Sequence, residues 1–391
     1  MSTQISIDAL VVGGGVAGLF ALGSIRNAGR SALLVESNGL GHGQTTSSQG
    51  ILHAGLKYSL SGMLGGGAAE AAEAAVTWSR MLQGEAQPSL AGVSVLSDHC
   101  LVWRTSRVLG LAGMFGARLA LRTKPTSVPV QQRPPWLAGV RGDVLRLAET
   151  VLDPREVLKH LASDHVGQLL HGAIHSVERR PDGMEVSIRC GEQSCKVFTQ
   201  QLILTAGEGN EALLSLLGMK AHPPMQRRPL RQAMVCGDLP LVYGHCIDGA
   251  ATRITVTSTN SNDGVVWNVG GELAEHGVAM DDTAFLMHAR HEISSCLPGV
   301  HLKQARWSQF HVQRAEPRTP GASRPHAAFV QSRDRVTVVW PVKLVLAPQA
   351  AAAIEPTLFP SRFPAAVWPH HLPAPELAAR PWENTPWRVL D

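Results

Sequence analysis

The sequence has few cysteines and no long hydrophobic run, and these absences exclude several classes of protein. Its six cysteines among 391 residues are scattered and form no Cys-x-x-Cys pair, so we predict neither a disulfide framework nor a metal site. No run of about 18 apolar residues occurs, which predicts no integral membrane segment. The N-terminus lacks a charged region ahead of an apolar stretch, so we expect no signal peptide and a cytoplasmic location, with peripheral contact to the inner membrane left open.

Charged residues are also scarce, at 17% of the chain, and neither sign dominates. The 35 Lys and Arg against 31 Asp and Glu give a net charge of +4, too small to indicate a nucleic-acid partner. Hydrophobic residues make up 44%, which argues against disorder and for a compact, enzyme-like protein. At about 150 residues per domain, the length predicts two or three domains.

A glycine-rich turn follows the first apolar run of the chain. Residues 5–12 are predicted to form a strand, 13–18 read Gly-Gly-Gly-Val-Ala-Gly and fit G-x-G-x-x-G, and 16–28 have the pattern of a helix. A second apolar run, 32–35, leads directly to Glu36. The order of strand, glycine turn, helix, strand and acidic residue predicts a Rossmann-like dinucleotide site.

Each member of this motif has a physical task. Gly13 permits the tight turn, Gly15 lets a pyrophosphate approach the backbone, and Gly18 lets the helix pack closely on the strand. The unpaired N–H groups at the start of the helix face the phosphates. Glu36 accepts hydrogen bonds from ribose hydroxyls and disfavours the 2′-phosphate of NADP. The motif alone does not separate NAD from FAD.

The segment after Glu36 favours FAD. Residues 37–58 are rich in Gly, Ser and Thr, where an NAD-binding unit would normally run into another helix. Here the sequence resembles the FAD oxidoreductases grouped with D-amino-acid oxidase, glycerol-3-phosphate dehydrogenase and L-2-hydroxyglutarate dehydrogenase. Residues 49–55 read Gln-Gly-Ile-Leu-His-Ala-Gly and are similar to the "SGVIHAG" stretch of the last of these enzymes.

The resemblance continues more loosely along the chain and implies the architecture. Asp153-Pro154 opens a predicted helix, residues 181–183 and 263–264 are predicted hairpin turns, and an apolar strand at 201–204 ends in Thr205-Ala206-Gly207. The implied fold class is α/β, with a discontinuous Rossmann-like FAD-binding domain and a mixed-sheet substrate domain. We assign residues 1–85, 145–220 and 330–391 to the FAD-binding domain and residues 86–144 and 221–329 to the substrate domain.

The glycine motif and the resemblance together imply one set of residues around FAD. Thr45 to Gly50 are implied to contact the pyrophosphate and flavin, and the turn at 205–207 passes beside the cofactor. The predicted cofactor contacts are Gly13, Gly15, Val16, Ala17, Gly18, Glu36, Ser37, Thr45, Thr46, Ser47, Ser48, Gln49, Gly50, Ile174, Ala206 and Gly207.

The candidate catalytic residues are His53, Lys343, Arg314 and Arg324. The resemblance implies that His53 lies near the isoalloxazine ring, as a general base, a substrate ligand or a covalent flavin attachment. Residues 340–344 read Trp-Pro-Val-Lys-Leu where the family usually has G-H-G-x-x-G, so Lys343 is a candidate to stabilise reduced flavin at N1/O2, or else a surface lysine.

An arginine is expected to bind the substrate's anionic group, since its planar head pairs with carboxylates. Arg314 and Arg324 are the main candidates, with Arg253 and Arg318 as further ones, and Tyr58 is a candidate for the pocket wall.

The predicted reaction is hydride transfer from a small, anionic substrate, such as a 2-hydroxy acid or a glycerol-3-phosphate-like molecule, to flavin N5. The electron acceptor, whether oxygen, a quinone or another molecule, stays open. The alternative is an amine or amino-acid oxidase of the same fold. Two other classes are an NAD-dependent dehydrogenase and a flavoprotein partner in assembly or RNA modification, for which Arg227, Arg228 and Arg231 are the only hint of a basic face.

Overall fold

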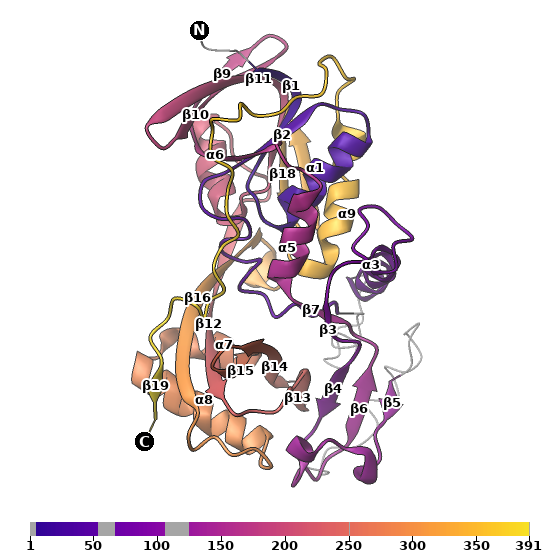
Figure 1. The fold of residues 1–391 in the computed structure, drawn as a ribbon, viewed down its shortest axis with the longest axis vertical. Coiled ribbons are helices and arrows are strands. Elements are labelled where there is room, and N and C mark those ends of the chain that lie inside the picture. Colours follow the sequence, from indigo (N-terminus) through magenta and orange to yellow (C-terminus); the bar gives the residue numbers. More distant parts are fainter. Residues whose placement is uncertain (1–4, 54–66, 106–124, 250, 391) are drawn as a thin grey trace.

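Two β-sheet units lie one above the other along the long axis of the molecule (Figure 1). The computed structural model describes residues 5–53, 67–105, 125–249 and 251–390. Tyr58 therefore lies outside the described residues. The N-terminal strand belongs to the upper unit, and the described chain ends beside the lower one. The predicted α/β fold is confirmed.

The upper unit is built on a mostly parallel sheet. Its main strands are β1 (Ile5–Val12), β2 (Ala32–Glu36), β8 (Leu169–His171), β11 (Gln193–Leu204), β17 (Phe329–Arg333) and β18 (Val336–Trp340). They are ordered β17-β18-β11-β1-β2-β8, and β1 runs parallel to both of its neighbours. A hairpin of β9 (Ala173–Arg180) and β10 (Gly183–Cys190) extends β11.

The central strand β1 is buried on both faces, which explains its continuous apolar sequence. Ala9 and Val11 pack in the core formed with helices α1, α5 and α9, while Leu10 and Val12 pack in the core on the opposite face. The helices of the upper unit are α1 (Val16–Asn27), α5 (Pro154–Ser163), α6 (Asn210–Leu216) and α9 (Ala347–Ala352). The predicted helix after Asp153 is present, because the Asp153 side chain accepts from the N–H of Arg155 and Pro154 occupies the first turn.

The lower unit is a nine-stranded sheet ordered β19-β16-β12-β15-β14-β13-β4-β6-β5. Its strands are β4 (Cys100–Trp103), β5 (Thr126–Ser127), β6 (Val144–Leu147), β12 (Met225–Gly237), β13 (Gly244–Asp248), β14 (Ala251–Ser261), β15 (Gly264–Gly270), β16 (Arg306–Pro317) and β19 (Arg388–Val389). Helices α7 (Glu272–His276) and α8 (Asp282–Cys296) belong to this unit, and α8 packs on its apolar core. The remaining elements are α3 (Gly67–Leu82) and a small pair, β3 (Val95–Ser97) with β7 (Val151–Leu152).

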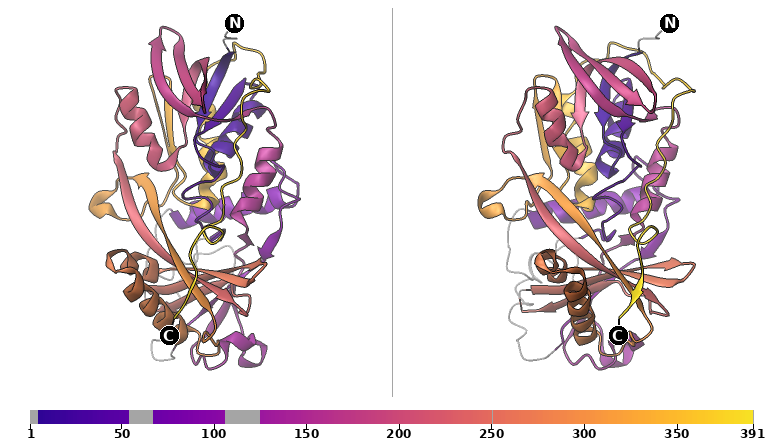
Figure 2. Two further views of the ribbon diagram at one scale, coloured as in Figure 1. Left: turned by 60° about the vertical axis from the view of Figure 1, so that its left-hand side comes forward. Right: turned by 90° about the vertical axis from the view of Figure 1, so that its left-hand side faces the viewer.

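The strands β12 and β16 connect the two units. They pair antiparallel from Met225 opposite Pro317 to Cys236 opposite Arg306, and Figure 2 shows them rising from the lower sheet to the upper one. Within this ribbon, β16 packs against the turn that follows β11, at Gly207–Gly209. Residues of both units therefore meet along it.

Two strands that the predicted domain division places wholly or mostly in the upper unit pair with strands of the lower sheet. We assigned residues from 145 and from 330 onward to the upper unit, but β6 pairs with β4 and β19 pairs with β16, both in the lower sheet. In β6, Val144, Leu145 and Leu147 are all buried, which suits a strand that pairs with both β4 and β5 inside the lower sheet. The C-terminal tail crosses from one unit to the other, as described below.

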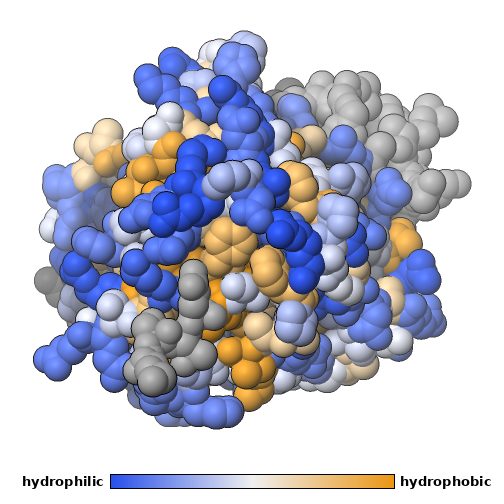
Figure 3. Space-filling view, turned by 90° about the horizontal axis from the view of Figure 1, so that it is seen from above, coloured by the Kyte–Doolittle hydropathy of each residue, from blue (hydrophilic) through white to orange (hydrophobic). Residues whose placement is uncertain are grey.

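Among the described residues, no helix is long and apolar enough to cross a membrane. Seen from above, hydrophilic residues cover most of the molecule, with hydrophobic ones gathered in small groups toward the middle of the view (Figure 3).

Candidate active site

The glycine turn after β1 lies against the turn that follows β11. Gly13 has φ +109°, and a Cβ there would come within 2.6 Å of the Ala206 Cα. A Cβ on Gly18 would come within 1.9 Å of the Gly13 carbonyl oxygen. The Thr205 hydroxyl donates to that same carbonyl at 2.9 Å. A side chain at Gly13 would therefore push the two turns apart, and one at Gly18 would push the helix away from the end of the strand.

The start of α1 lies at the edge of a cavity, which Val16 lines. Its cap residue, Gly15, provides no side-chain acceptor, and the Val16 N–H donates to the Thr45 hydroxyl at 3.2 Å. The Glu36 carboxylate is held by backbone donors, Gly14 N–H at 2.6 Å and Asn38 N–H at 2.7 Å. A helix N-terminus beside an oriented carboxylate fits the pyrophosphate and ribose of a dinucleotide.

The loop from Gln44 to Gly50 bridges the two units. The Gln44 side-chain oxygen accepts from the Ala315 N–H at 3.0 Å, on β16. The Gln49 amide donates to the carbonyls of Thr255 at 2.8 Å and Asn268 at 3.0 Å, on β14 and β15. Glutamine side chains thus fix this loop across the lower sheet.

A cavity of about 520 Å³ lies between the two units. Its walls come from the Gln44–Gly50 loop, the β12–β16 ribbon, the segment 270–275 and the segment 341–345. Two buried polar atoms in its wall, Ser48 Oγ and Gln232 Oε1, have no hydrogen-bond partner among the residues that the structure describes. Such atoms fit a polar ligand, and the flavin ring of FAD supplies both donors and acceptors.

The structure distributes the predicted cofactor contacts unevenly. Thr46 donates its hydroxyl to the Gly41 carbonyl, Ser37 is exposed, and Ile174 packs with the apolar core under the β9–β10 hairpin. Ala206 and Gly207 lie in the turn against Gly13 and Gln44. Those that line the cavity are Val16, Thr45, Ser47, Ser48, Gln49 and Gly50.

All four candidate catalytic residues, His53, Lys343, Arg314 and Arg324, line this cavity. Arg324 forms an ion pair with Glu275 at 3.1 Å. The guanidinium of Arg314, in contrast, has neither a hydrogen bond nor an ion pair with any residue that the structure describes. Burial, together with the nearby cations Arg324 and Arg228, lowers the pKa of Arg314 to about 10.

Lys343 follows a turn in which Val342 has φ +56°, and its amino group donates to the His326 carbonyl at 3.4 Å. Burial lowers the pKa of Lys343 to about 8, and Arg324 contributes in the same direction. The side chain is half-buried in the cavity wall.

Other predicted cations lie elsewhere. Arg253 does not line the cavity, since its guanidinium pairs with Asp248 and Glu292, each at 3.0 Å. Arg318 is exposed outside the cavity. Arg231, part of the suggested basic face, is 2% exposed and pairs with Asp282, so it does not contribute to a basic surface.

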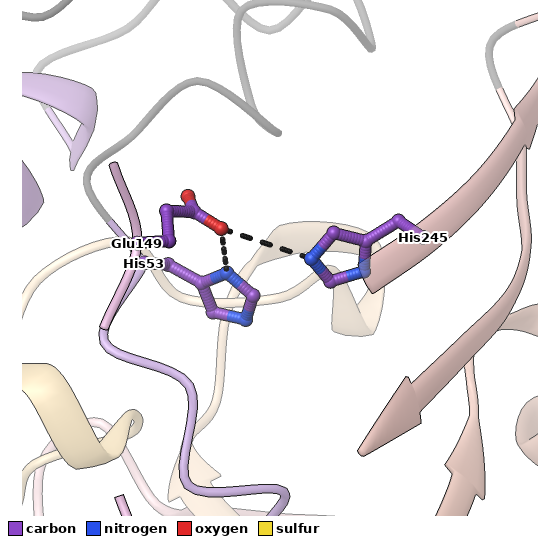
Figure 4. Close-up of side chains that lie close together, drawn as sticks. All are labelled: His53, Glu149 and His245. Atoms are coloured by element: carbon purple, nitrogen blue, oxygen red, sulfur yellow. Dashed lines mark hydrogen bonds and ion pairs between the residues drawn. The ribbon is translucent and has the colours of Figure 1, made fainter. Parts of the chain in front are cut away.

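A buried cluster that sequence reasoning missed lies behind His53. The Glu149 carboxylate stands between two imidazoles, with Oε2 3.3 Å from His53 Nδ1 and 3.7 Å from His245 Nε2 (Figure 4). Glu149 is 1% exposed, His245 is fully buried, and His53 is 20% exposed toward the cavity. The available signal was a lone acidic residue in the mostly apolar run 144–152 and a lone histidine in the run 242–247.

The sequence profile of a family described as "FAD dependent oxidoreductase" matches residues 8–367. The chain belongs to this family. It is an FAD-dependent oxidoreductase, which decides against the NAD-dependent dehydrogenase that the glycine motif alone allowed. The turns, the helix start and the unpartnered polar atoms of the cavity fit this cofactor.

The relatives of this FAD-dependent oxidoreductase support the same assignment. "Probable FAD-dependent oxidoreductase PA4991" from Pseudomonas aeruginosa is 38% identical over 394 residues, covering 98% of this chain and 99% of the relative. The crystal structure of PA4991 matches with a TM-score of 0.81 and 35% identity, covering 98% of this chain and 99% of that one.

Two more distant structures share the fold. Glycine oxidase from Geobacillus kaustophilus has a TM-score of 0.67 at 13% identity, covering 91% of this chain and 96% of that one. L-alpha-glycerophosphate oxidase from Mycoplasma pneumoniae, with FAD bound, has a TM-score of 0.65 at 14% identity, covering 92% and 97%.

Proposed function

We propose that this FAD-dependent oxidoreductase oxidises a small anionic molecule, a 2-hydroxy acid or a glycerol-3-phosphate-like substrate. The observation that carries the proposal is the Arg314 guanidinium, which lines the cavity without an acidic partner among the described residues. A partly buried cation among other cations is unfavourable until an anion joins it. A substrate carboxylate or phosphate would supply that anion through two parallel hydrogen bonds.

The neighbouring cations are better satisfied than Arg314. Arg228 pairs with Glu316 at 2.7 Å, and Arg324 pairs with Glu275 at 3.1 Å. They raise the positive potential at Arg314 without competing for its anion. Arg314 is therefore the proposed substrate anchor, and Arg324 contributes charge beside it.

His53 is the proposed general base, since its ring reaches the cavity while its Nδ1 faces Glu149. Its imidazole can accept the proton of a substrate hydroxyl near neutral pH. When bound, FAD supplies the hydride acceptor, flavin N5. Lys343 places a cation in the wall of the same cavity, where the family's glycine-rich turn is absent.

An amino acid or other amine is the second candidate substrate. Glu272 and Glu275 line the cavity together with Arg314, so a carboxylate and an ammonium group of one molecule would both find opposite charges. Hydroxy acids and amino acids would use the same arginine and differ only in the group that gives up its proton.

Anaerobic reduction of the bound flavin tests the proposal. We expect the yellow absorbance to bleach with 2-hydroxy acids, glycerol 3-phosphate or amino acids, but not with the uncharged amides of the same acids. The Arg314→Gln variant should need about 10- to 100-fold more substrate for the same rate, since a hydrogen bond to a charged group contributes about 1.5–3 kcal/mol.

The matched control is Arg318→Gln, an exposed arginine outside the cavity, which should behave as wild type. Equal bleaching by acid and amide, or no effect of Arg314→Gln, would contradict the proposed anion site. Acid precipitation of the unmodified enzyme separately tests covalent attachment at His53, because covalent flavin stays with the pellet.

A further inference from the structure

Glu149 is a buried carboxylate that lies within 4 Å of two imidazoles, those of His53 and His245. Burial alone would raise the pKa of the Glu149 carboxyl, but His53 and His245 more than offset that effect and hold the pKa below its ordinary value. The group is therefore an anion in a dry site, which is costly unless it is hydrogen-bonded and paired.

We propose that Glu149, supported by His245, is a positioning residue that holds His53 with its proton on Nδ1, so that Nε2 is the nitrogen that accepts the substrate proton. The inference rests on the proposed function for its catalytic meaning, but its geometry does not depend on the identity of the substrate. The proton would pass from the substrate hydroxyl to Nε2, while Nδ1–H remains shared with Glu149.

The support for Glu149 comes from the lower sheet. His245 lies on β13, and its Nδ1 is 2.8 Å from the Thr255 hydroxyl on β14. With that hydroxyl donating to Nδ1, the His245 proton is on Nε2 and points toward Glu149 Oε2. At 3.7 Å this contact is electrostatic rather than a hydrogen bond, so His245 attracts the carboxylate from one side while His53 faces it on the other (Figure 4).

The position of His53 distinguishes this cluster from an ordinary buried ion pair. Glu149 and His245 are closed to solvent, while His53 is 20% exposed and lines the cavity with Arg314. The cluster thus opens at one end only, where the substrate is expected. A carboxylate behind a histidine of this kind sets the ring orientation and tautomer and stabilises the imidazolium that forms.

The charged groups around His53 set the direction of the expected effect. Glu149 and His245 face it from behind. The other ionisable groups of the cavity wall are Arg228, Arg314, Arg324, Lys343, Glu272, Glu275 and His326. Since Glu149 is the anion in direct contact with the ring, its removal should destabilise the imidazolium and make His53 titrate at a lower pH.

The test is ¹⁵N-histidine NMR of the FAD-loaded enzyme without substrate, with the His53 signals assigned from a His53→Gln variant. In the wild type, neutral His53 should show the Nδ1–H form. Glu149→Gln keeps the size of the side chain and removes its charge, so His53 should titrate about one to three pH units lower and lose its tautomer preference. Glu149→Asp should lie between the two.

The exposed Glu178→Gln on β9 is the matched control and should leave the His53 titration unchanged. If Glu149→Gln fails to retain flavin or to fold, the comparison of wild type with Glu149→Asp decides. An unchanged titration and tautomer in a flavin-loaded Glu149 variant would overturn the proposal. So would one equivalent of a divalent metal on the cluster that a chelator removes with a change in the His53 signals.

Activity adds a second measurement once a reducing substrate is found. Glu149→Gln should lower kcat about 100-fold or more, while KM changes little, and the acid limb of kcat/KM should move to lower pH. If no acid or amine bleaches the wild-type flavin but the His53 titration shifts as expected, the proposed function fails and the positioning role stands. If substrates bleach the flavin but the His53 titration does not shift in the Glu149 variant, the positioning role is wrong and the proposed function stands.

Discussion

Lys343 is a cavity cation whose charge changes in the weakly alkaline range. Its pKa of about 8 follows from burial and from the neighbouring Arg324. The ammonium form therefore predominates below about pH 8, and the side chain becomes neutral as the pH rises through that value. A cation at this place would favour the reduced, negatively charged flavin only in the lower pH range.

We therefore expect Lys343→Met to lower the midpoint potential of the bound flavin at pH 7 by about 30 mV or more, which corresponds to about 1.4 kcal/mol for a two-electron couple. Above pH 9 the difference from wild type should shrink, because wild-type Lys343 is then neutral. Spectroelectrochemistry of the holoenzyme measures both values. The exposed Lys159→Met is the control, and equal potentials for Lys343→Met and wild type at pH 7 would refute the role.

Residues of the site differ in how far one sequence predicts them. His53 lies two positions beyond the Gln49-Gly50-Ile51 stretch and was found through a local motif. Glu149 and His245 belong to no motif. Glu149 lies 96 positions after His53 in the sequence. Only the folded chain brings them together, so a lone acid in an apolar run is the most that a sequence offers.

At the scale of elements, the turn between β1 and α1 depends on missing side chains. A methyl group on Gly18 would meet the Gly13 carbonyl oxygen, a backbone atom that cannot move away without displacing the turn. In the same helix, a methyl group on Gly23 would meet only the His165 ring nitrogen at 3.4 Å, an ordinary contact. The close packing of α1 on the end of β1 therefore requires glycine at position 18 but not at position 23.

We expect Gly18→Ala to lose FAD during purification and Gly23→Ala to retain it. Gly23→Ala should also stabilise the helix by up to about 1 kcal/mol, because alanine has the higher helix propensity. The flavin-to-protein absorbance ratio and thermal unfolding measure the two effects. Retention of FAD by Gly18→Ala would mean that the helix does not need its close approach to β1.

The sequence predicts best those elements whose determining residues are neighbours in the chain. The strand, glycine turn and helix over 5–27 and the capped helix from Pro154 depend on neighbours in the chain. In contrast, β6 and β19 are short, and they are strands only because β4 and β16 pair with them. Their place in the lower sheet is a long-range contact, which the domain bounds implied by the resemblance did not include.

At the scale of the molecule, the C-terminal tail spans both units (Figures 1 and 2). Trp368, 3% exposed, packs on the upper unit and donates its Nε1 to the carbonyls of Leu34 at 3.2 Å and Gln168 at 3.0 Å. Further along, Arg380 pairs with Asp153 at the start of α5 at 2.5 Å. The tail then ends as β19 on the lower sheet. Its irregular, proline-rich sequence therefore serves as a strap rather than as a loose extension.

Trp368 is a large, buried side chain of that strap, so we expect its removal to affect both the upper core and the far end of the tail. Trp368→Ala should lower the free energy of unfolding by about 3–5 kcal/mol, because it opens a cavity in the upper core. The adjacent Val367 is 52% exposed, and Val367→Ala should change the free energy little. Urea unfolding with limited proteolysis measures both variants. Since the strap also reaches β19, cleavage within 379–390 should accelerate in Trp368→Ala, and equal cleavage of the two variants would show that the tail does not couple the units.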